Sequence, residues 1–255
     1  MKHLKKFEQK ALYESYISNS PTLPNVSYVE EDNIVYYNPY VIDTTIDTTG
    51  FANGVYAVSA DYKLIDYKTA DESCIGVALI TDNQKIMIEK NGEANTDIIK
   101  AAYEADGATD TSYQRFYWGS NTDITSITNS KNSDAAKQDF NGKANTVAII
   151  ATPNTDNNME CANMGTYCIK FNEMSGTYED WYIPASGQLY EIYKNVTDID
   201  IALSNIGGTN FNMSNFYWSS SEYLSSQACG VYFSYGSVDG YDKKARFLVR
   251  LIRDI

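Results

Sequence analysis

The side chains that usually carry out enzyme chemistry are scarce in this sequence. Histidine occurs once in 255 residues, as His3, which leaves no Ser-His-Asp or Cys-His arrangement and no histidine metal site to consider. The cysteines lack CxxC spacing, and if Cys161 and Cys168 share a helix they lie about 10 Å apart along its axis, too far for a disulfide. We expect all four, Cys74, Cys161, Cys168 and Cys229, to be buried free thiols, and we expect no metal and no cofactor.

Carboxylates are abundant, with 33 Asp and Glu against 20 Lys and Arg and a formal net charge of −13. A pair suited to glycoside hydrolysis could form in space, but no spacing selects one, so we do not expect an enzyme. The acidic balance argues against nucleic acid and anionic membrane surfaces as partners. The opening MKHLKKFEQKALYESYISNS lacks the apolar stretch of a signal peptide, and no run approaches the roughly 20 residues of a membrane span.

Tyrosine, serine and glycine are concentrated in residues 215–250, NFYWSSSEYLSSQACGVYFSYGSVDGYDKKARFLVR. Strand alternation in GVYFSYGSV places Val231, Phe233 and Val238 on a packing face and Tyr232, Ser234 and Ser237 on the opposite one. Tyrosine among small polar residues is typical of binding loops, because its ring offers a large amphipathic contact with few rotors. The alternative is a tyrosine-rich sheet surface that has no partner.

Two parts of the chain must position these residues. Residues 1–50 predict a small arm: a helix over 4–16, stopped by SNSPTLPN, and a hairpin over 26–38 that turns at Glu30–Asn33. The link DTTIDTTG separates this arm from a main domain over residues 51–255. The arm would anchor that domain in a larger assembly.

The main domain predicts strands, then helices, then strands, which is the order of an α+β fold. Strands are expected within 55–67 and 74–90. Helices are expected over 95–105, 143–151, 158–168, 184–196 and 198–208. The second of these would have Asn145 as its N-cap, and the last would end at Gly207–Gly208. Strands follow at 216–223, 229–241 and 246–255. The last should be central, buried on both sides and beside the first, with Arg250 and Arg253 paired with carboxylates.

One short sequence recurs, FYWGS at 116–120 and FYWSS at 216–220. The intervening segments do not match. The repeated sequence therefore predicts a strand-and-turn structure that occurs twice, and not a solenoid.

The stretches YWSSSEY and GVYFSYGSVDGYDKKARFLVRLIRD, with DWYIPASGQLYEIY upstream, resemble the variable proteins of diversity-generating retroelements. That family has a C-type lectin fold of the formylglycine-generating-enzyme type. The opening LPNVSYVEEDNIVYYNP is similar to openings of structural proteins of phages that infect gut bacteria. The resemblance covers most of the chain, and its specific part is the region 217–250.

The resemblance implies a fixed buried scaffold that carries diversified, solvent-facing ligand contacts. The scaffold positions would be Trp218, Glu222, Val231, Phe233, Val249 and Arg250. The ligand contacts would be Tyr223, Leu224, Ser225, Ser226, Tyr232, Ser234, Tyr235, Asp239, Gly240, Tyr241, Asp242 and Phe247. Cys229 departs from the family pattern, which usually has tryptophan there.

The resemblance also implies a function. A diversified tyrosine-rich surface would bind a host cell-surface protein or glycan during phage adsorption, in a homo-oligomer for which a trimer is favoured. The protein would be made in the cytoplasm without a signal peptide and would end in the virion as part of the phage tail. The alternative is a structural component of a particle whose tyrosine face packs on a neighbouring subunit. A glycan-acting or sulfatase-modifying enzyme is a distant third.

Overall fold

The computed structural model describes residues 28–31, 34–37, 45–108, 114–152, 161–174 and 180–255. The chain forms two compact units, Met1–Ile46 and Asp47–Ile255. In the first unit, β1 (Tyr28–Glu31) pairs antiparallel with β2 (Ile34–Tyr37), with Glu31 opposite Ile34, which confirms the predicted hairpin. The predicted helix over 4–16 and the residues of the hairpin turn itself lie outside the described part of the chain.

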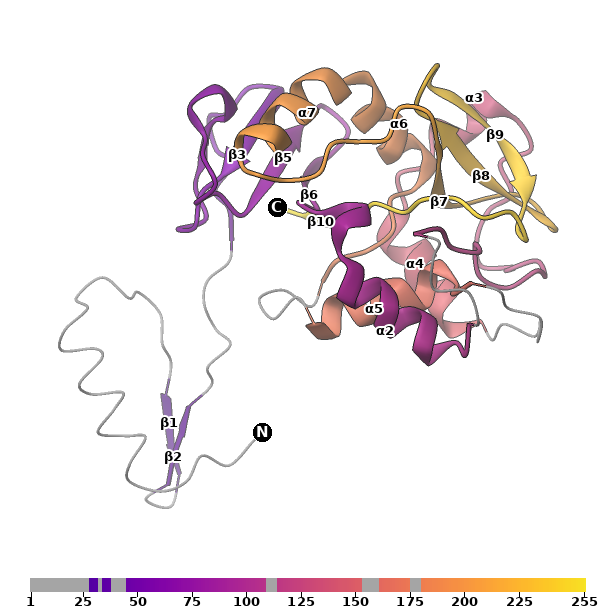
Figure 1. Cartoon of the computed structure of the whole chain (residues 1–255), viewed down its shortest axis with the longest axis horizontal. Helices are drawn as coiled ribbons and strands as arrows, with labels where there is room; N and C mark the ends of the chain where they lie inside the picture. Colours follow the sequence, from indigo (N-terminus) through magenta and orange to yellow (C-terminus); the bar gives the residue numbers. More distant parts are fainter. Residues whose placement is uncertain (1–27, 32–33, 38–44, 109–113, 153–160, 175–179) are drawn as a thin grey trace. The chain divides into compact units, whose positions relative to one another are not determined.

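The second unit is built on a five-stranded antiparallel sheet (Figure 1). Its order is β10-β6-β5-β3-β4, and its strands are β3 (Gly54–Val58), β4 (Leu64–Asp66), β5 (Gly76–Ile80), β6 (Lys85–Ile88) and β10 (Ile252–Asp254). Every residue of β5 is buried, as its unbroken apolar sequence GVALI requires of a central strand. The strands predicted within 55–67 and 74–90 are confirmed.

Two consecutive helices lie between this sheet and a second one. Helix α6 (Ser186–Lys194) packs on the second sheet, and α7 (Val196–Asn205) packs on β3 and β5. Leu189, Ile192 and Val196 form the predicted apolar stripe and belong to one hydrophobic core with both sheets. Gly207 adopts a left-handed φ of +69° just beyond α7, as predicted for its end.

A second group of helices comprises α2 (Thr96–Ala105), α4 (Gly142–Ala151) and α5 (Met164–Met174), with α5 packed on both of the others. Short helices occur at η1 (Tyr67–Thr69), η2 (Gly92–Ala94) and α3 (Ser133–Ala136). The N-cap expected at Asn145 is wrong. The N-cap residue of α4 is Asn141, and Asn145 lies buried inside the helix, where its Nδ2 donates to Asp139 Oδ2 at 3.0 Å.

The second sheet has the order β7-β8-β9 and is antiparallel throughout. Its strands are β7 (Phe216–Leu224), β8 (Gln227–Tyr232) and β9 (Ser237–Asp242). The register between β7 and β8 shifts between Trp218 and Glu222. The three consecutive serines at this irregularity, residues 219 to 221, are all buried.

The final segment is not the long central strand that its sequence predicts. Only Ile252–Asp254 forms a strand, at the edge of the large sheet, and it pairs with β6 and not with the first strand. Before it, Phe247 bridges to Phe116 and Leu248 to Tyr217, because the chain here crosses from the small sheet to the large one. The predicted burial on both sides is confirmed, since residues 248–252 are all buried.

The fold class is therefore α+β, with antiparallel sheets and segregated helices. All four cysteines are buried and free, as predicted. Within the part of the chain that the structure describes, no helix combines the length and apolarity needed to cross a membrane.

Candidate ligand-binding face

The three-stranded sheet has one face in the core and one face that carries aromatic rings. Tyr217, Cys229, Val231 and Val238 belong to the core face and are fully or almost fully buried, together with Phe233 just after β8. Phe216, Tyr232 and Tyr241 alternate with them and remain partly exposed. The alternation predicted for GVYFSYGSV is thus confirmed.

The exposed rings form a connected cluster, which we call the aromatic face: Phe216, Tyr232, Tyr235, Tyr241 and Phe247. Phe216 lies at its centre, with ring centroids 4.4 Å from Tyr232, 4.9 Å from Tyr241 and 4.9 Å from Phe247. Tyr235 extends the cluster by an edge contact with Tyr232 at 5.5 Å. Such mutual packing holds each ring in place while part of its surface stays in water.

Gly230 makes room for this cluster. A Cβ atom at this position would lie 3.0 Å from both the Phe247 and the Tyr241 rings. Alanine at this position would require both rings to shift by a few tenths of an ångström, and a longer side chain would need more room. Gly230 therefore allows the two rings to lie close to the strand.

Two buried tryptophans lie next to the aromatic face, and they come from the repeated FYW sequences. The Trp218 ring lies 4.3 Å from Phe247, and its indole N–H donates to the carbonyl of Phe116 at 2.8 Å. The Trp118 indole N–H donates in turn to the carbonyl of Ser219 at 2.7 Å. The two repeated sequences thus hold one another by reciprocal hydrogen bonds, which the sequence alone did not indicate.

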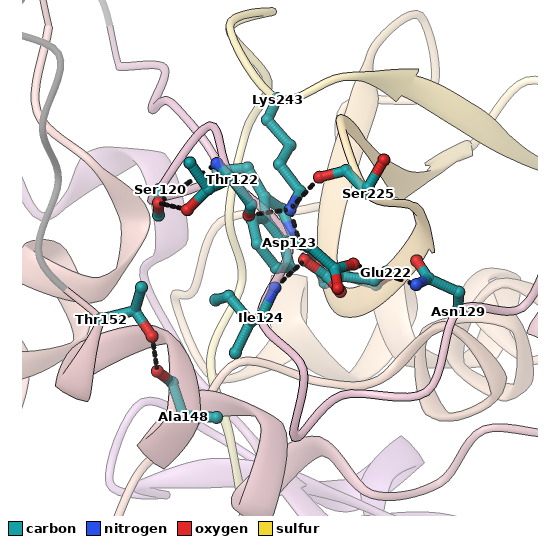
Figure 2. Close-up of polar contacts among 12 residues, drawn as sticks. Ser120, Thr122, Asp123, Ile124, Asn129, Ala148, Thr152, Glu222, Ser225 and Lys243 are labelled. Atoms are coloured by element: carbon teal, nitrogen blue, oxygen red, sulfur yellow. Dashed lines mark hydrogen bonds and ion pairs between the residues drawn. The ribbon is translucent and has the colours of Figure 1, made fainter.

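A buried ion pair fixes the hairpin that joins β7 to β8 (Figure 2). The Lys243 ammonium donates to Glu222 Oε1, to the carbonyl of Thr122 at 2.7 Å and to that of Ser225 at 3.1 Å. It also lies 4.5 Å from the centre of the Trp118 ring. One ammonium therefore connects the loop at Thr122 with the hairpin tip.

Glu222 completes this connection. Its Oε1 also accepts from the Ile124 N–H at 3.0 Å, and both its side chain and that of Lys243 are shielded from solvent. Burial raises the pKa of Glu222, whereas the hydrogen bond and charge of Lys243 oppose that shift. The carboxylate serves to position backbone and is not placed to meet a ligand.

The predicted contact residues are all at least partly accessible. Leu224, Ser225, Ser226, Ser234, Tyr235, Asp239 and Asp242 are exposed, and Tyr223, Tyr232, Gly240, Tyr241 and Phe247 are partly exposed. Tyr235 is the most open of the large side chains, at 78%. All six predicted scaffold residues, Trp218, Glu222, Val231, Phe233, Val249 and Arg250, are buried.

The structure does not bring all twelve together. The Tyr223 ring packs against Gly240 and the hydrophobic core, on the opposite side of the sheet from Tyr232 and Tyr241. Leu224, Ser225 and Ser226 form the β7–β8 hairpin tip, whereas Ser234 and Tyr235 lie at the β8–β9 turn, at the other end of the strands. Because β8 spans six residues, the two tips are roughly 20 Å apart.

Sequence reasoning missed two residues of this site. Phe216 is the central ring, and its alternation with Trp218 along β7 was the available signal. Lys243 was not named, although it is the buried cation nearest the hairpin tip. Arg253 pairs with Asp180 at 3.0 Å as predicted. Arg250 donates to the backbone carbonyls of Glu89, Thr209 and Asn210, and its charge also opposes the rise in pKa that burial causes at the Glu89 carboxyl.

The one cysteine of the three-stranded sheet, Cys229, lies on its core face. Burial raises the pKa of the Cys229 thiol to about 12, so the thiol stays protonated and is a poor nucleophile at neutral pH. Among the described residues, no group of three or more His, Cys, Asp or Glu side chains could hold a metal ion. The arrangement is suited to recognition through rings and hydroxyls.

No protein-family model and no curated protein matches the sequence. Among solved structures, the chain is similar to a fimbrial protein from Bacteroides ovatus, with a TM-score of 0.52 and 13% sequence identity. The match covers 80% of this chain and 49% of the fimbrial protein, so this chain spans about half of the length of its neighbour. At this identity the likeness concerns the fold alone.

Proposed function

We propose that this protein recognises a ligand through the aromatic face and the two adjoining hairpin tips, without catalysis. The observation that carries the proposal is the cluster of five mutually packed, partly exposed rings beside the buried Trp218. Rings held in this way lose little freedom on binding, which lowers the entropic cost of association. Exposed serines at both tips supply adaptable hydrogen bonds around them.

The target we propose is a host cell-surface protein or glycan, met by a protein of the virion. The fold would be of C-type lectin type and the region 217–250 diversified, as the resemblance to retroelement variable proteins implies. In support, every scaffold position of that resemblance is buried and every contact position is accessible. Likeness to a fimbrial protein also suits a role in surface attachment. Several copies in one particle, a trimer for example, would add avidity.

Replacing Tyr232, Tyr235 and Tyr241 together by alanine should abolish binding of labelled protein to whole gut-bacterial cells, measured by flow cytometry. The rings of Tyr232 and Tyr241 also pack on Phe216, so each loss should cost about 0.5–1.5 kcal/mol of stability without unfolding the protein. The matched control replaces Tyr56, Tyr62 and Tyr190, partly exposed tyrosines outside the three-stranded sheet. If both triple variants are folded and bind the cells equally well, the proposed site is refuted.

Diversification has its own test in the neighbouring DNA. A reverse-transcriptase gene and a near-copy of the codons for residues 217–250 should lie beside the gene. Their absence would remove diversification from the proposal while leaving recognition by the aromatic face open to the binding test.

The second candidate function is assembly, in which the aromatic face packs on a neighbouring subunit of a particle. The fimbrial neighbour is the observation that favours it. Light scattering of the isolated protein, together with hydrogen exchange across β8 and β9, distinguishes the two. A stable homo-oligomer that protects Tyr232 and Tyr241 would support assembly, and an accessible aromatic face would support recognition.

A further inference from the structure

A separate polar hollow lies along the outer edge of β7. Its volume is about 390 Å³, near the lower end of the roughly 300–1,000 Å³ that is usual for small-molecule sites. Its walls are the loop 126–130, the segment 135–141 and the first turn of α4. The Ser130 N–H donates to the Glu222 carbonyl at 3.0 Å, so the loop wall is fastened to β7.

Hydrogen bonds to Asp139 hold one wall of the hollow in place. Asp139 accepts four hydrogen bonds: Oδ2 from Asn145 Nδ2 at 3.0 Å and from Ser221 Oγ at 2.6 Å, and Oδ1 from the backbone N–H and Nδ2 of Asn141 at 2.9 and 3.1 Å. These bonds tie α4, the preceding loop and β7 together. A ligand would therefore meet a preformed surface.

Other polar groups in the hollow are available. Ser126, Thr128 and Gln138 line it and are exposed, and in the described part of the chain their side chains make no hydrogen bond. Hydroxyl and amide groups can both donate and accept. These three side chains can therefore bind groups that do the same, above all the hydroxyls of a ligand.

The composition of the walls selects the class of ligand. Eight of the ten lining residues have hydroxyl, amide or carboxylate side chains, two are alanines, and none is lysine or arginine. Among these ten residues an anion would find no positive charge, and their one carboxylate, that of Asp139, already accepts from four donors. We propose that this hollow binds one ring of a neutral sugar, whose hydroxyls meet the polar walls while its C–H groups lie on Ala135 and Ala144.

Saturation-transfer NMR tests this proposal. The ligands are four neutral monosaccharides (glucose, galactose, mannose and N-acetylglucosamine), and glucuronate is the anionic comparison. At least one neutral sugar should give a saturable signal with a millimolar dissociation constant. Ala144→Trp should fill the hollow and weaken that binding at least about tenfold. Val147→Trp, a substitution at a 64% exposed position of the same helix outside the hollow, is the matched control and should change nothing.

A second variant, Gln138→Ala, removes one available amide at an exposed position and should also weaken binding while the circular dichroism spectrum is unchanged. No saturable signal from any neutral sugar, undiminished binding by Ala144→Trp, or tighter binding of glucuronate would each overturn the proposal. The triple tyrosine variant should keep its monosaccharide binding. If it loses that binding, the sugar occupies the aromatic face and the hollow is not the site.

Discussion

Lys243 and Glu222 show how two single side chains control the geometry of the candidate site. Both are shielded from water, and between them they hold the backbone at Thr122, Ile124 and Ser225. A buried charge that loses its partner lowers the stability of the fold, because water does not reach it and no opposite charge compensates it. This pair therefore holds the β7–β8 hairpin in a fixed position against the loop at Thr122 and Ile124.

Lys243→Met should lower the free energy of unfolding by about 3–5 kcal/mol, because it leaves the Glu222 carboxylate buried and uncompensated. The double variant Glu222→Gln, Lys243→Met should recover part of that loss, since Gln can still accept from Ile124. Lys63→Met is the control. It removes an exposed pair with Asp61, which solvent screens, so its urea midpoint should barely change. Urea denaturation measures all three, and a Lys243→Met as mild as Lys63→Met would contradict this account.

The buried thiols predict how stability depends on alkaline pH. Burial raises the pKa of both Cys168 and Cys229 from 9.0 to about 12. Above pH 9 the unfolded chain releases these protons while the folded chain keeps them, so rising pH favours unfolding. The free energy of unfolding should fall by up to about 1.4 kcal/mol per thiol for each pH unit above pH 9.

Urea midpoints between about pH 8 and about pH 9.3 measure the start of this slope, below the ordinary tyrosine pKa of about 10. Cys168→Ala, Cys229→Ala should flatten the slope even if the substitution lowers stability at every pH. An identical slope in the double variant would show that other groups cause it.

The short turns between β7, β8 and β9 position the rings of the aromatic face and form the two hairpin tips beside it. Gly236 closes the β8–β9 turn with a φ of +65°, its N–H donating to the Tyr232 carbonyl at 2.8 Å. A Cβ here would overlap the Tyr193 ring of α6. The turn is thus set by its backbone conformation and by contact with the helix beneath it.

Gly236→Ala and Gly107→Ala separate these two effects. Both glycines have a φ of +65°, but among the described residues, apart from its chain neighbours, no atom lies within 4 Å of a Cβ at Gly107. Gly107→Ala should cost about 1–2 kcal/mol for the left-handed conformation alone. Gly236→Ala should cost about 1–3 kcal/mol more for overpacking. Thermal denaturation compares them, and equal losses would mean that Tyr193 moves aside freely.

At the scale of the whole molecule, one hydrophobic core of described residues lies within the unit Asp47–Ile255. Its buried residues run from Val55 to Ile252 and join both sheets to α6 and α7. Because this core draws on the first and the last strands of Asp47–Ile255, that unit has what an autonomous domain requires.

Residues 47–255 expressed alone should therefore unfold in one cooperative transition, with a stability within about 0.5 kcal/mol of the whole chain. Chemical denaturation followed by both tryptophan fluorescence and circular dichroism measures this. Two separate transitions would show that residues 47–255 do not unfold as one unit, and a fragment that does not fold would show that its stability depends on residues 1–46.

The sequence by itself determined the features that depend on local periodicity. Alternation in β8 and β9 predicted which residues are buried, the 3.6-residue spacing predicted α6, and Gly207 predicted the end of α7. Burial of the scaffold residues also follows from such local patterns, because a period of two or 3.6 places side chains on one face whatever the rest of the chain does.

Only the tertiary structure decided the features that join distant segments. Phe116 bridges to Phe247 and Lys243 reaches Thr122, each across more than a hundred residues of sequence, and Phe247 in turn stacks on Phe216. The side of the sheet that Tyr223 takes, the crossing at 247–248 and the polar hollow follow from the same long-range contacts. No local period encodes them, since they depend on which surfaces meet when the whole core closes.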